Sequence, residues 1–219
     1  MRLPRGVQHS SRKPWTPGVK ASAAPEGGGS GGGGAPLTWG ETSLFRAYAA
    51  RANYLGMGRP GIAFAAKEFC RRVSEPTEAD LVALRRLAQY LVGSPRLVYS
   101  YPWQDHAGLS VYAGTDFVGC PTTRTSTSGG VLCRGAHVVQ HWITTQTCIT
   151  LSSGEAELGG VVKGVAEGLG AQALAADMGL DLALSVHVDS SAAIDICRRS
   201  GIGRVRRLAV DQLWVQAHL

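Results

Sequence analysis

Three acidic residues stand where an element of regular structure is expected to begin or end. Asp116 closes an alternating apolar run that starts at Leu109, and Asp189 closes a similar run that starts at Leu184. Glu157 lies between them, early in a long apolar-periodic stretch. Two strand ends and one helical turn can bring three carboxylates to one place, and an all-oxygen set suits Mg²⁺ or Mn²⁺ rather than zinc. Two such ions can stabilise the attacking and leaving oxygens of a phosphodiester, so this pattern indicates a metal-dependent nuclease site.

Each carboxylate also has an ordinary structural interpretation. An aspartate at a strand end commonly caps a solvated turn, and a glutamate in a first helical turn commonly complements the helix dipole. Ser152 and Glu155 have the S-x-x-E spacing of a capping box, which predicts that Glu155 reaches back to the N-cap. Glu157 points about 200° away from Glu155 and shares a face with Val161 and Val165, the face expected to pack on the sheet. Glu157 is therefore the better ligand candidate.

Five blocks of the sequence match short family motifs, in the same order along residues 42 to 219. Residues 142–158 are similar to W-x-S-x-x-Q-x-x-x-x-L-S-S-x-E-A-E-Y, residues 124–130 to R-R-S-T-S-G-Y and residues 188–194 to C-D-N-x-S-A-I. Upstream, residues 54–64 are similar to Y-L-x-x-T-R-P-D-I-x-F and residues 89–94 to R-Y-L-K-G-T. Together these blocks resemble the RNase H region of copia-type retrotransposon Pol polyproteins.

The resemblance implies an RNase H-like fold that hydrolyses the RNA strand of an RNA–DNA hybrid. It further implies a two-ion Mg²⁺ or Mn²⁺ site held by Asp116, Glu157 and Asp189. One departure affects this site directly. Relatives carry S-D-A-D-W-A-G in the first catalytic strand, and alignment on Asp116 places their leading metal ligand at Gly114. Asp116 faces the same side of the strand but lies ~6–7 Å further on, so it is at best a displaced substitute.

A second departure lies near the end of the chain. Relatives supply a fourth carboxylate from a Q-x-A-D-x-L-T-K segment after their last strand, and the sequence ends at Leu219 before either. Asp211 does not replace it, because the family aspartate of this stretch aligns with Ala209; we interpret Asp211 as a solvated helix residue. Two hypotheses remain: an RNase H whose activity is impaired, and a catalytically inactive remnant that keeps the fold and nucleic-acid binding.

Residues 107–219 are expected to form the RNase H-like domain, an α/β fold with a mixed sheet flanked by helices, lacking the family's last strand and helix. Short links favour antiparallel pairing of the first three strands, and a helical crossover makes the fourth parallel to the first. Glycines along the long helix weaken it, and they either permit close packing on the sheet or reflect drift. The expected strands are 109–117, 130–140, 141–151 and 184–189, and the expected helices are 153–179 and 191–200.

The preceding sequence divides into two parts. Residues 1–37 combine Pro, Ser and scattered basic residues with a glycine run, which predicts a disordered tail. Residues 38–106 are expected to be helical, with Thr38 and Thr77 as N-caps and Pro60 starting the second helix. An apolar stripe of Phe45, Tyr48, Ala52 and Leu55 is expected on the first helix. In copia-type polyproteins this segment connects the reverse transcriptase to the RNase H domain, and no Y-x-D-D polymerase motif is present.

Charge and cysteine content discriminate weakly. The net charge of +6 is concentrated in the tail, so overall basicity is poor evidence for nucleic-acid binding. The five cysteines form no C-x-x-C pair and are interpreted as reduced and mostly buried. Neither a signal peptide nor a run of about 18 apolar residues is present, which indicates an intracellular chain without a membrane partner. One basic cluster either contacts the phosphates of a hybrid or is a solvated patch: Arg198, Arg199, Arg204, Arg206 and Arg207.

Overall fold

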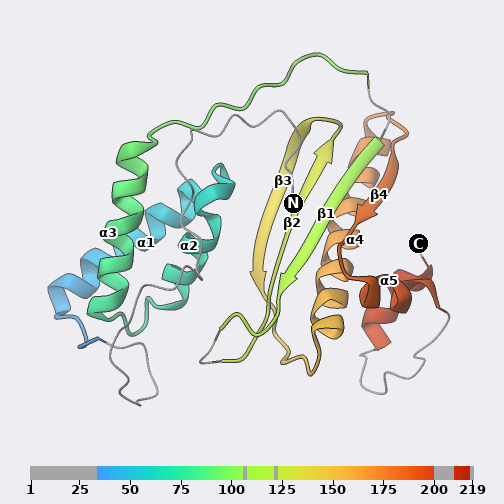
Figure 1. Cartoon of the computed structure of the whole chain (residues 1–219). Helices are drawn as coiled ribbons and strands as arrows, with labels where there is room; N and C mark the ends of the chain where they lie inside the picture. Colours follow the sequence, from blue (N-terminus) through green and yellow to red (C-terminus); the bar gives the residue numbers. More distant parts are fainter. Residues whose placement is uncertain (1–33, 106–107, 121–122, 200–209, 218–219) are drawn as a thin grey trace. The chain divides into compact units, whose positions relative to one another are not determined.

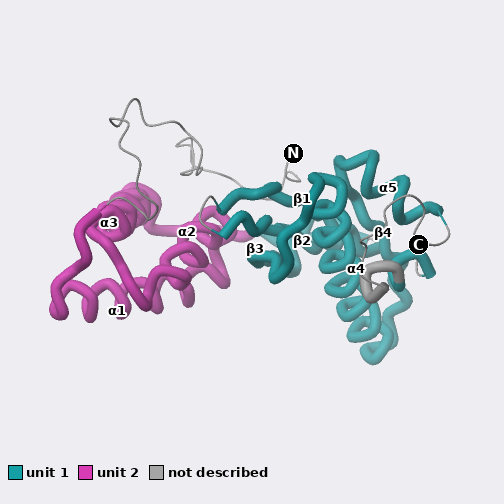
Figure 2. Tube along the Cα trace, turned by 90° about the horizontal axis from the view of Figure 1, so that it is seen from below, with its two compact units in different colours: residues 1–6, 100–219 teal, residues 7–99 magenta. Residues whose placement is uncertain are grey.

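The computed structural model describes residues 34–105, 108–120, 123–199 and 210–217 (Figure 1). The chain divides into two compact units, and the boundary between them falls between Tyr99 and Ser100 (Figure 2). The boundary expected from the sequence, between residues 106 and 107, lies a few residues further on. Most of the expected N-terminal tail, residues 1–33, lies outside the described residues.

The helical unit, which ends at Tyr99 (unit 2 in Figure 2), is built as expected, and its helices begin at the predicted residues. They are α1 (Trp39–Met57), α2 (Pro60–Arg71) and α3 (Glu78–Gly93). Thr38 forms a capping box with Glu41, and Thr77 forms one with Asp80. Proline is favoured at the first position of a helix because its missing N–H would have no partner there, which explains the start of α2 at Pro60. The local sequence therefore determines where each of these helices begins.

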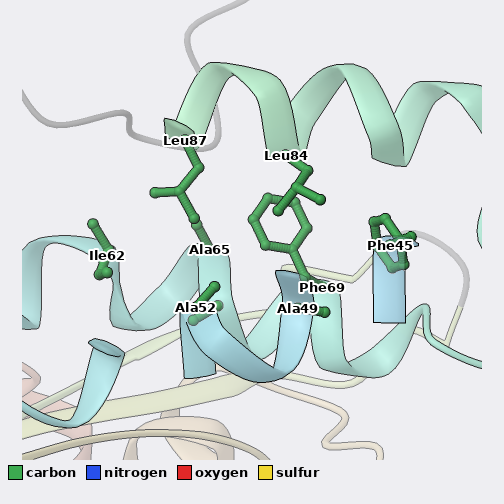
Figure 3. Close-up of a cluster of buried hydrophobic side chains, with 9 residues drawn as sticks. Phe45, Ala49, Ala52, Ile62, Ala65, Phe69, Leu84 and Leu87 are labelled. Carbon is green, nitrogen blue, oxygen red and sulfur yellow. The ribbon is translucent and has the colours of Figure 1, made fainter. Parts of the chain in front are cut away.

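The core of this unit is formed by small and aromatic side chains from all three helices. Phe45 of α1 and Phe69 of α2 meet edge to face, with ring centroids 6.2 Å apart. Leu84 and Leu87 of α3 pack onto them (Figure 3). The expected stripe on α1 is partly wrong, because Tyr48 and Leu55 are 48% and 43% exposed. The buried face instead follows the helical repeat from Phe45 through Ala49, Ala52 and Gly56.

The sheet unit, which starts at Ser100 (unit 1 in Figure 2), is built on a four-stranded mixed sheet, which confirms the predicted α/β fold. Its strands are β1 (Gly108–Asp116), β2 (Thr127–Arg134), β3 (His137–Thr145) and β4 (Ala183–His187), in the order β3-β2-β1-β4. The first three are antiparallel in sequence order, and β4 is parallel to β1. The turn between β2 and β3 comes earlier than predicted. Gly135 adopts a φ of +56°, which favours glycine, so it marks a turn that fell inside the predicted strand 130–140.

Helix α4 (Ser153–Asp177) connects β3 to β4 and packs along one face of the sheet (Figure 1). Its glycines are not equivalent. A Cβ at Gly164 would lie 3.1 Å from the Ala113 and Val111 side chains, and one at Gly168 would lie 2.8 Å from Leu184. A Cβ at Gly170 would meet nothing within 4 Å. The glycines that face the sheet therefore permit close packing, the first of the two interpretations, whereas Gly170 has no such role.

The remaining described elements are α5 (Ser191–Arg198) and a 3₁₀ helix, η1 (Val210–Ala217). Ile196 and Cys197 of α5 and Val215 of η1 pack with the inner face of α4. All five cysteines are free thiols, and Cys120, Cys133 and Cys197 are buried, as predicted. None of the helices in the described ranges is long and apolar enough to cross a membrane.

Candidate active site

The first turn of α4 places Glu155 and Glu157 in different environments. Ser152 is the N-cap, and its hydroxyl accepts a hydrogen bond of 3.2 Å from the Glu155 N–H. The Glu155 carboxylate accepts from the Leu151 N–H at 2.9 Å, one residue before the predicted Ser152 partner. The predicted partner was wrong by one residue, because the carboxylate reaches past the N-cap to the next exposed amide. Glu155 nevertheless serves the helix end, which leaves Glu157 as the candidate ligand.

Glu157 lies against the C-terminal half of β1. Strand β4 ends opposite Tyr112, so the Thr115 N–H has no partner in β4, and the Glu157 carboxylate accepts a hydrogen bond from it. Its Oε2 atom is buried and has no hydrogen-bond partner. Burial raises the pKa of Glu157 most, the negative charge of Asp189 raises it further, and the Thr115 N–H lowers it. The ionised form of this carboxyl group is therefore less stable than that of an exposed glutamate.

Asp189 lies just beyond β4, immediately before the N-cap Ser190 of α5, and is exposed. The parallel pairing of β1 and β4 ends at Tyr112 and His187. Continued two residues further, this register brings Asp189 level with Gly114. A Cβ at Gly114 would have no heavy atom within 4 Å. The Cβ position at Gly114, where the resemblance places the leading ligand, is therefore open.

Asp116 lies at the turn that follows β1. It ends β1 and is exposed, and its carboxylate lies over Gly119 of the turn that follows. This is the turn-capping arrangement that the sequence also allowed. Within the described ranges, no three His, Cys, Asp or Glu side chains form a group that could hold a metal ion. The structure thus places the Asp189 charge near enough to Glu157 to raise its pKa, whereas the Asp116 carboxylate lies at the Gly119 turn.

The Glu157 and Asp189 carboxylates are the right type of ligand for a hard divalent cation, but two of them are too few. Both offer only oxygen ligands, and an uncompensated buried oxygen on Glu157 is the kind of atom that a cation would satisfy. Two carboxylates are fewer than the ligand set implied by the family. The two carboxylates therefore supply part of the ligand set of a metal site. The missing ligand is the one that the family alignment places at Gly114.

A polar network beneath Glu157 was not singled out from the sequence. Gln146 donates through Nε2 to Ser128 Oγ at 2.8 Å and to the Ala156 carbonyl at 2.7 Å. Thr115 Oγ1 donates to the same carbonyl at 3.2 Å and lies 3.4 Å from Ser128 Oγ. The available signal was the Gln in the family motif that spans residues 142–158. Its significance depends on contacts between segments that are distant in sequence.

Only part of the arginine cluster lies within the residues that the structure describes. Arg198 and Arg199 are exposed at the end of α5, and the Arg199 Nε donates to the Asp195 carbonyl at 2.9 Å. Arg204, Arg206 and Arg207 lie outside the described residues, as does the side chain of Asp211. The expected contact with nucleic-acid phosphates therefore stays a prediction.

Comparison with known proteins gives relatives of one kind. No protein-family profile matches the sequence. The uncharacterized mitochondrial protein AtMg00810 of Arabidopsis thaliana is 31% identical over 119 residues, which are 53% of this chain and 49% of that protein. The retrovirus-related Pol polyproteins from transposons RE1 and RE2 of the same plant are 25% and 23% identical over 175 residues, covering 78% of this chain. That region is 12% of each polyprotein, so the chain spans a small part of their length.

Proposed function

Starting from a chain derived from a copia-type retrotransposon Pol polyprotein, we propose that it is an RNase H-like domain with impaired activity. The reaction would be metal-dependent hydrolysis of the RNA strand of an RNA–DNA hybrid. One observation carries this proposal: the partly buried Glu157 carboxylate, whose pKa the Asp189 charge raises further, has an unsatisfied buried oxygen, and the Cβ position of Gly114 on the neighbouring strand β1 is open. Two family ligand positions keep their carboxylates, and the leading one has lost its own.

The electrostatics of the pair support a cation at this place. The negative charge of Asp189 raises the pKa of Glu157, and a positive charge near the Glu157 carboxylate would favour its ionised form. A bound Mg²⁺ or Mn²⁺ would generate a nucleophilic hydroxide from water and neutralise charge on the phosphodiester. Glu157 and Asp189 would hold it, and the Thr115 N–H would keep the Glu157 carboxylate oriented.

The lack of a carboxylate at Gly114 and the position of the Asp116 carboxylate support the proposal that the activity is impaired. Gly114 carries no ligand, and the Asp116 carboxylate is engaged over Gly119. Removal of one charge-stabilising group from an active site commonly lowers the rate ~10²–10³-fold. The unmodified chain is therefore expected to cleave hybrids only slightly above background.

A second candidate is a non-catalytic remnant that binds nucleic acid. The lost ligand at Gly114 favours it, as do Arg198 and Arg199, which are exposed at the end of α5. Binding without cleavage, even after repair of Gly114, distinguishes this candidate from an impaired enzyme.

Restoration of the leading carboxylate tests the proposal. Gly114→Asp should raise hybrid cleavage by ~10²-fold or more. The substitution needs no backbone change, because Gly114 does not have a positive φ and its Cβ position is open. Gly114→Asn is the matched control, since it has the same shape without the charge and should stay near background. The measurement is release of labelled RNA fragments from an RNA–DNA hybrid in Mg²⁺ or Mn²⁺.

Two results would contradict the proposed impairment. Strong cleavage by the unmodified chain, abolished by Asp116→Asn, would mean that Asp116 has taken over the lost ligand's role. Tight hybrid binding by Gly114→Asp without cleavage would favour the non-catalytic remnant.

A further inference from the structure

We infer that Gln146 is a positioning residue, which fixes the first turn of α4, and with it Glu157, against β1. Its functional meaning rests on the function proposed above. The observation behind it is that the Gln146 side chain joins the sheet and the start of α4 through two hydrogen bonds at once. It binds Ser128 of β2 at 2.8 Å and the Ala156 carbonyl of α4 at 2.7 Å.

The backbone of Gln146 is itself fixed to the sheet. Its N–H donates to the Ser126 carbonyl at 2.8 Å, directly after β3 ends at Thr145. The side chain therefore extends from a rigid point toward α4. Ala156, whose carbonyl it binds, immediately precedes Glu157 and is fully buried. A helix held at this residue cannot rotate or rise from the sheet without moving the Glu157 carboxylate as well.

Thr115 closes the network from the other side. Its hydroxyl binds the same Ala156 carbonyl at 3.2 Å, and its backbone N–H binds the Glu157 carboxylate. One residue of β1 thus contacts both the helix backbone and the candidate ligand. Ser128, which lies between Thr115 and Gln146, is 3% exposed. Hydrogen bonds in such a dry region are stronger and restrict geometry more than hydrogen bonds in water.

Two glycines of α4 leave the space that this network occupies. A Cβ at Gly159 would lie 2.9 Å from Gln146 Nε2, and one at Gly160 would lie 2.5 Å from Thr115 Oγ1. Each network residue that reaches the helix therefore faces a glycine. The Ser152 N-cap fixes where α4 begins, but it belongs to the helix end and does not fix the helix against the sheet. Gln146 and Thr115 are the residues that fix α4 against the sheet.

The test is the hydrogen exchange rate of the Thr115 amide, measured by NMR on the full chain without metal. Gln146→Met keeps the length of the side chain and removes its donors. Gln172→Met is the matched control, because Gln172 lies on α4 and, like Gln146, donates through its Nε2 to a backbone carbonyl, that of Leu182 at 2.7 Å. Both variants should melt at lower temperature. Only Gln146→Met should accelerate Thr115 exchange by about tenfold or more beyond the change of neighbouring β1 amides.

A positive control and a second anchor variant complete the design. Glu157→Ala should accelerate Thr115 exchange directly, since it removes the acceptor of that N–H. Ser128→Ala removes one anchor of Gln146 and should give a smaller change in the same direction, which tests the inference if Gln146→Met does not fold. An equal effect of Gln146→Met and Gln172→Met on Thr115 exchange would overturn the inference.

The same variants separate this inference from the proposed function. In the Gly114→Asp background, Gln146→Met should raise the Mg²⁺ concentration needed for half-maximal cleavage. If Thr115 exchange responds as expected and the repaired chain still cleaves no hybrid, Gln146 positions Glu157 and the proposed reaction is wrong. If the repaired chain is active with an unchanged Mg²⁺ requirement in Gln146→Met, the inference about Gln146 is wrong.

Discussion

At the scale of single residues, the environment of Glu157 makes the ionised form of its carboxyl group destabilising for the folded state. Burial is the main cause, and the Asp189 charge adds to it. The same helix carries a glutamate in the opposite situation. Lys163 lowers the pKa of Glu167 through a hydrogen bond and an ion pair, and Gln140 also donates to it. The two side chains should therefore respond to pH in opposite directions.

We predict that Glu157→Gln stabilises the protein at neutral pH. The folded-state pKa of Glu157 is raised above its ordinary value of 4.5, so the folded state binds this proton more tightly than the unfolded chain. Stability is consequently lost as pH rises from about 4.5 through the raised pKa. The gain in melting temperature for Glu157→Gln should appear across that window and be absent at lower pH. The neutral amide keeps an acceptor for the Thr115 N–H.

Glu167→Gln is the control, because a lowered folded-state pKa contributes stability at neutral pH that is lost as pH falls. This variant should melt below the parent at pH 7, and the difference should vanish in acid. Melting temperatures of the three proteins, measured from about pH 3 to pH 8, provide the test. A lower melting temperature for Glu157→Gln at pH 7 would show that the ionised carboxylate is stabilising, in contradiction to its environment.

At the scale of elements, helix α4 is both a poor helix former and a closely packed one. Glycine costs up to ~1 kcal/mol relative to alanine inside a helix. The helix bears this cost at the positions where it packs against β1 and β4, which are Gly160, Gly164 and Gly168. The approach brings Ala156 and Glu157 within hydrogen-bonding distance of Thr115. The weak helix-forming tendency is therefore linked to the geometry of the candidate site.

We predict opposite effects of the same substitution at two positions of α4. Gly170→Ala should stabilise the protein by up to ~1 kcal/mol, because this residue is exposed and the new Cβ meets nothing within 4 Å. Gly160→Ala should destabilise it by ~1–3 kcal/mol, the usual cost of overpacking, because the new Cβ would lie 2.5 Å from Thr115 Oγ1. Urea unfolding curves measure both. Equal stabilisation by the two substitutions would mean that α4 does not pack on β1 as closely as described.

At the scale of the whole molecule, the chain consists of two units with separate cores. The helical unit depends on a small core around Phe45 and Phe69, and small domains bury too little surface to have much stability in reserve. The sheet unit has its own core around Val111, Leu132 and Trp142. Damage to one core should therefore leave the other folded.

We predict that Phe45→Ala unfolds the helical unit alone. Truncation of a buried phenylalanine typically costs ~3–5 kcal/mol, which is comparable with the total stability of a small domain. The NMR signals of α1, α2 and α3 should lose dispersion while those of β1, β2 and β3 keep theirs. Tyr48→Ala, on the same helix but 48% exposed, is the control and should change neither set. Simultaneous loss of both sets would show that the two units fold as one.

The sequence by itself determined the features that depend on neighbours along the chain. Thr38 and Ser152 cap helices because their hydroxyls reach amides only three residues away, and at Thr77 the carboxylate of Asp80, also three residues away, accepts from the Thr77 backbone N–H. The alternating and helical periods fixed the order of strands and helices and the parallel fourth strand. The motif alignment also predicts that the leading ligand is missing at Gly114, and the turn between β2 and β3 was misplaced because the predicted strand 130–140 included Gly135.

The tertiary structure alone decided which of the candidate groups meet. Spacing predicts the side of a strand on which Asp116 lies, but the direction of its carboxylate depends on the turn at Gly119. The pairing of Glu157 with Asp189 requires the register of β4 on β1 and the close approach of α4. Gln146 acquires its role only when β2, β3 and α4 come together. Contacts between distant segments depend on packing distances of a few ångströms, which no local period in the sequence encodes.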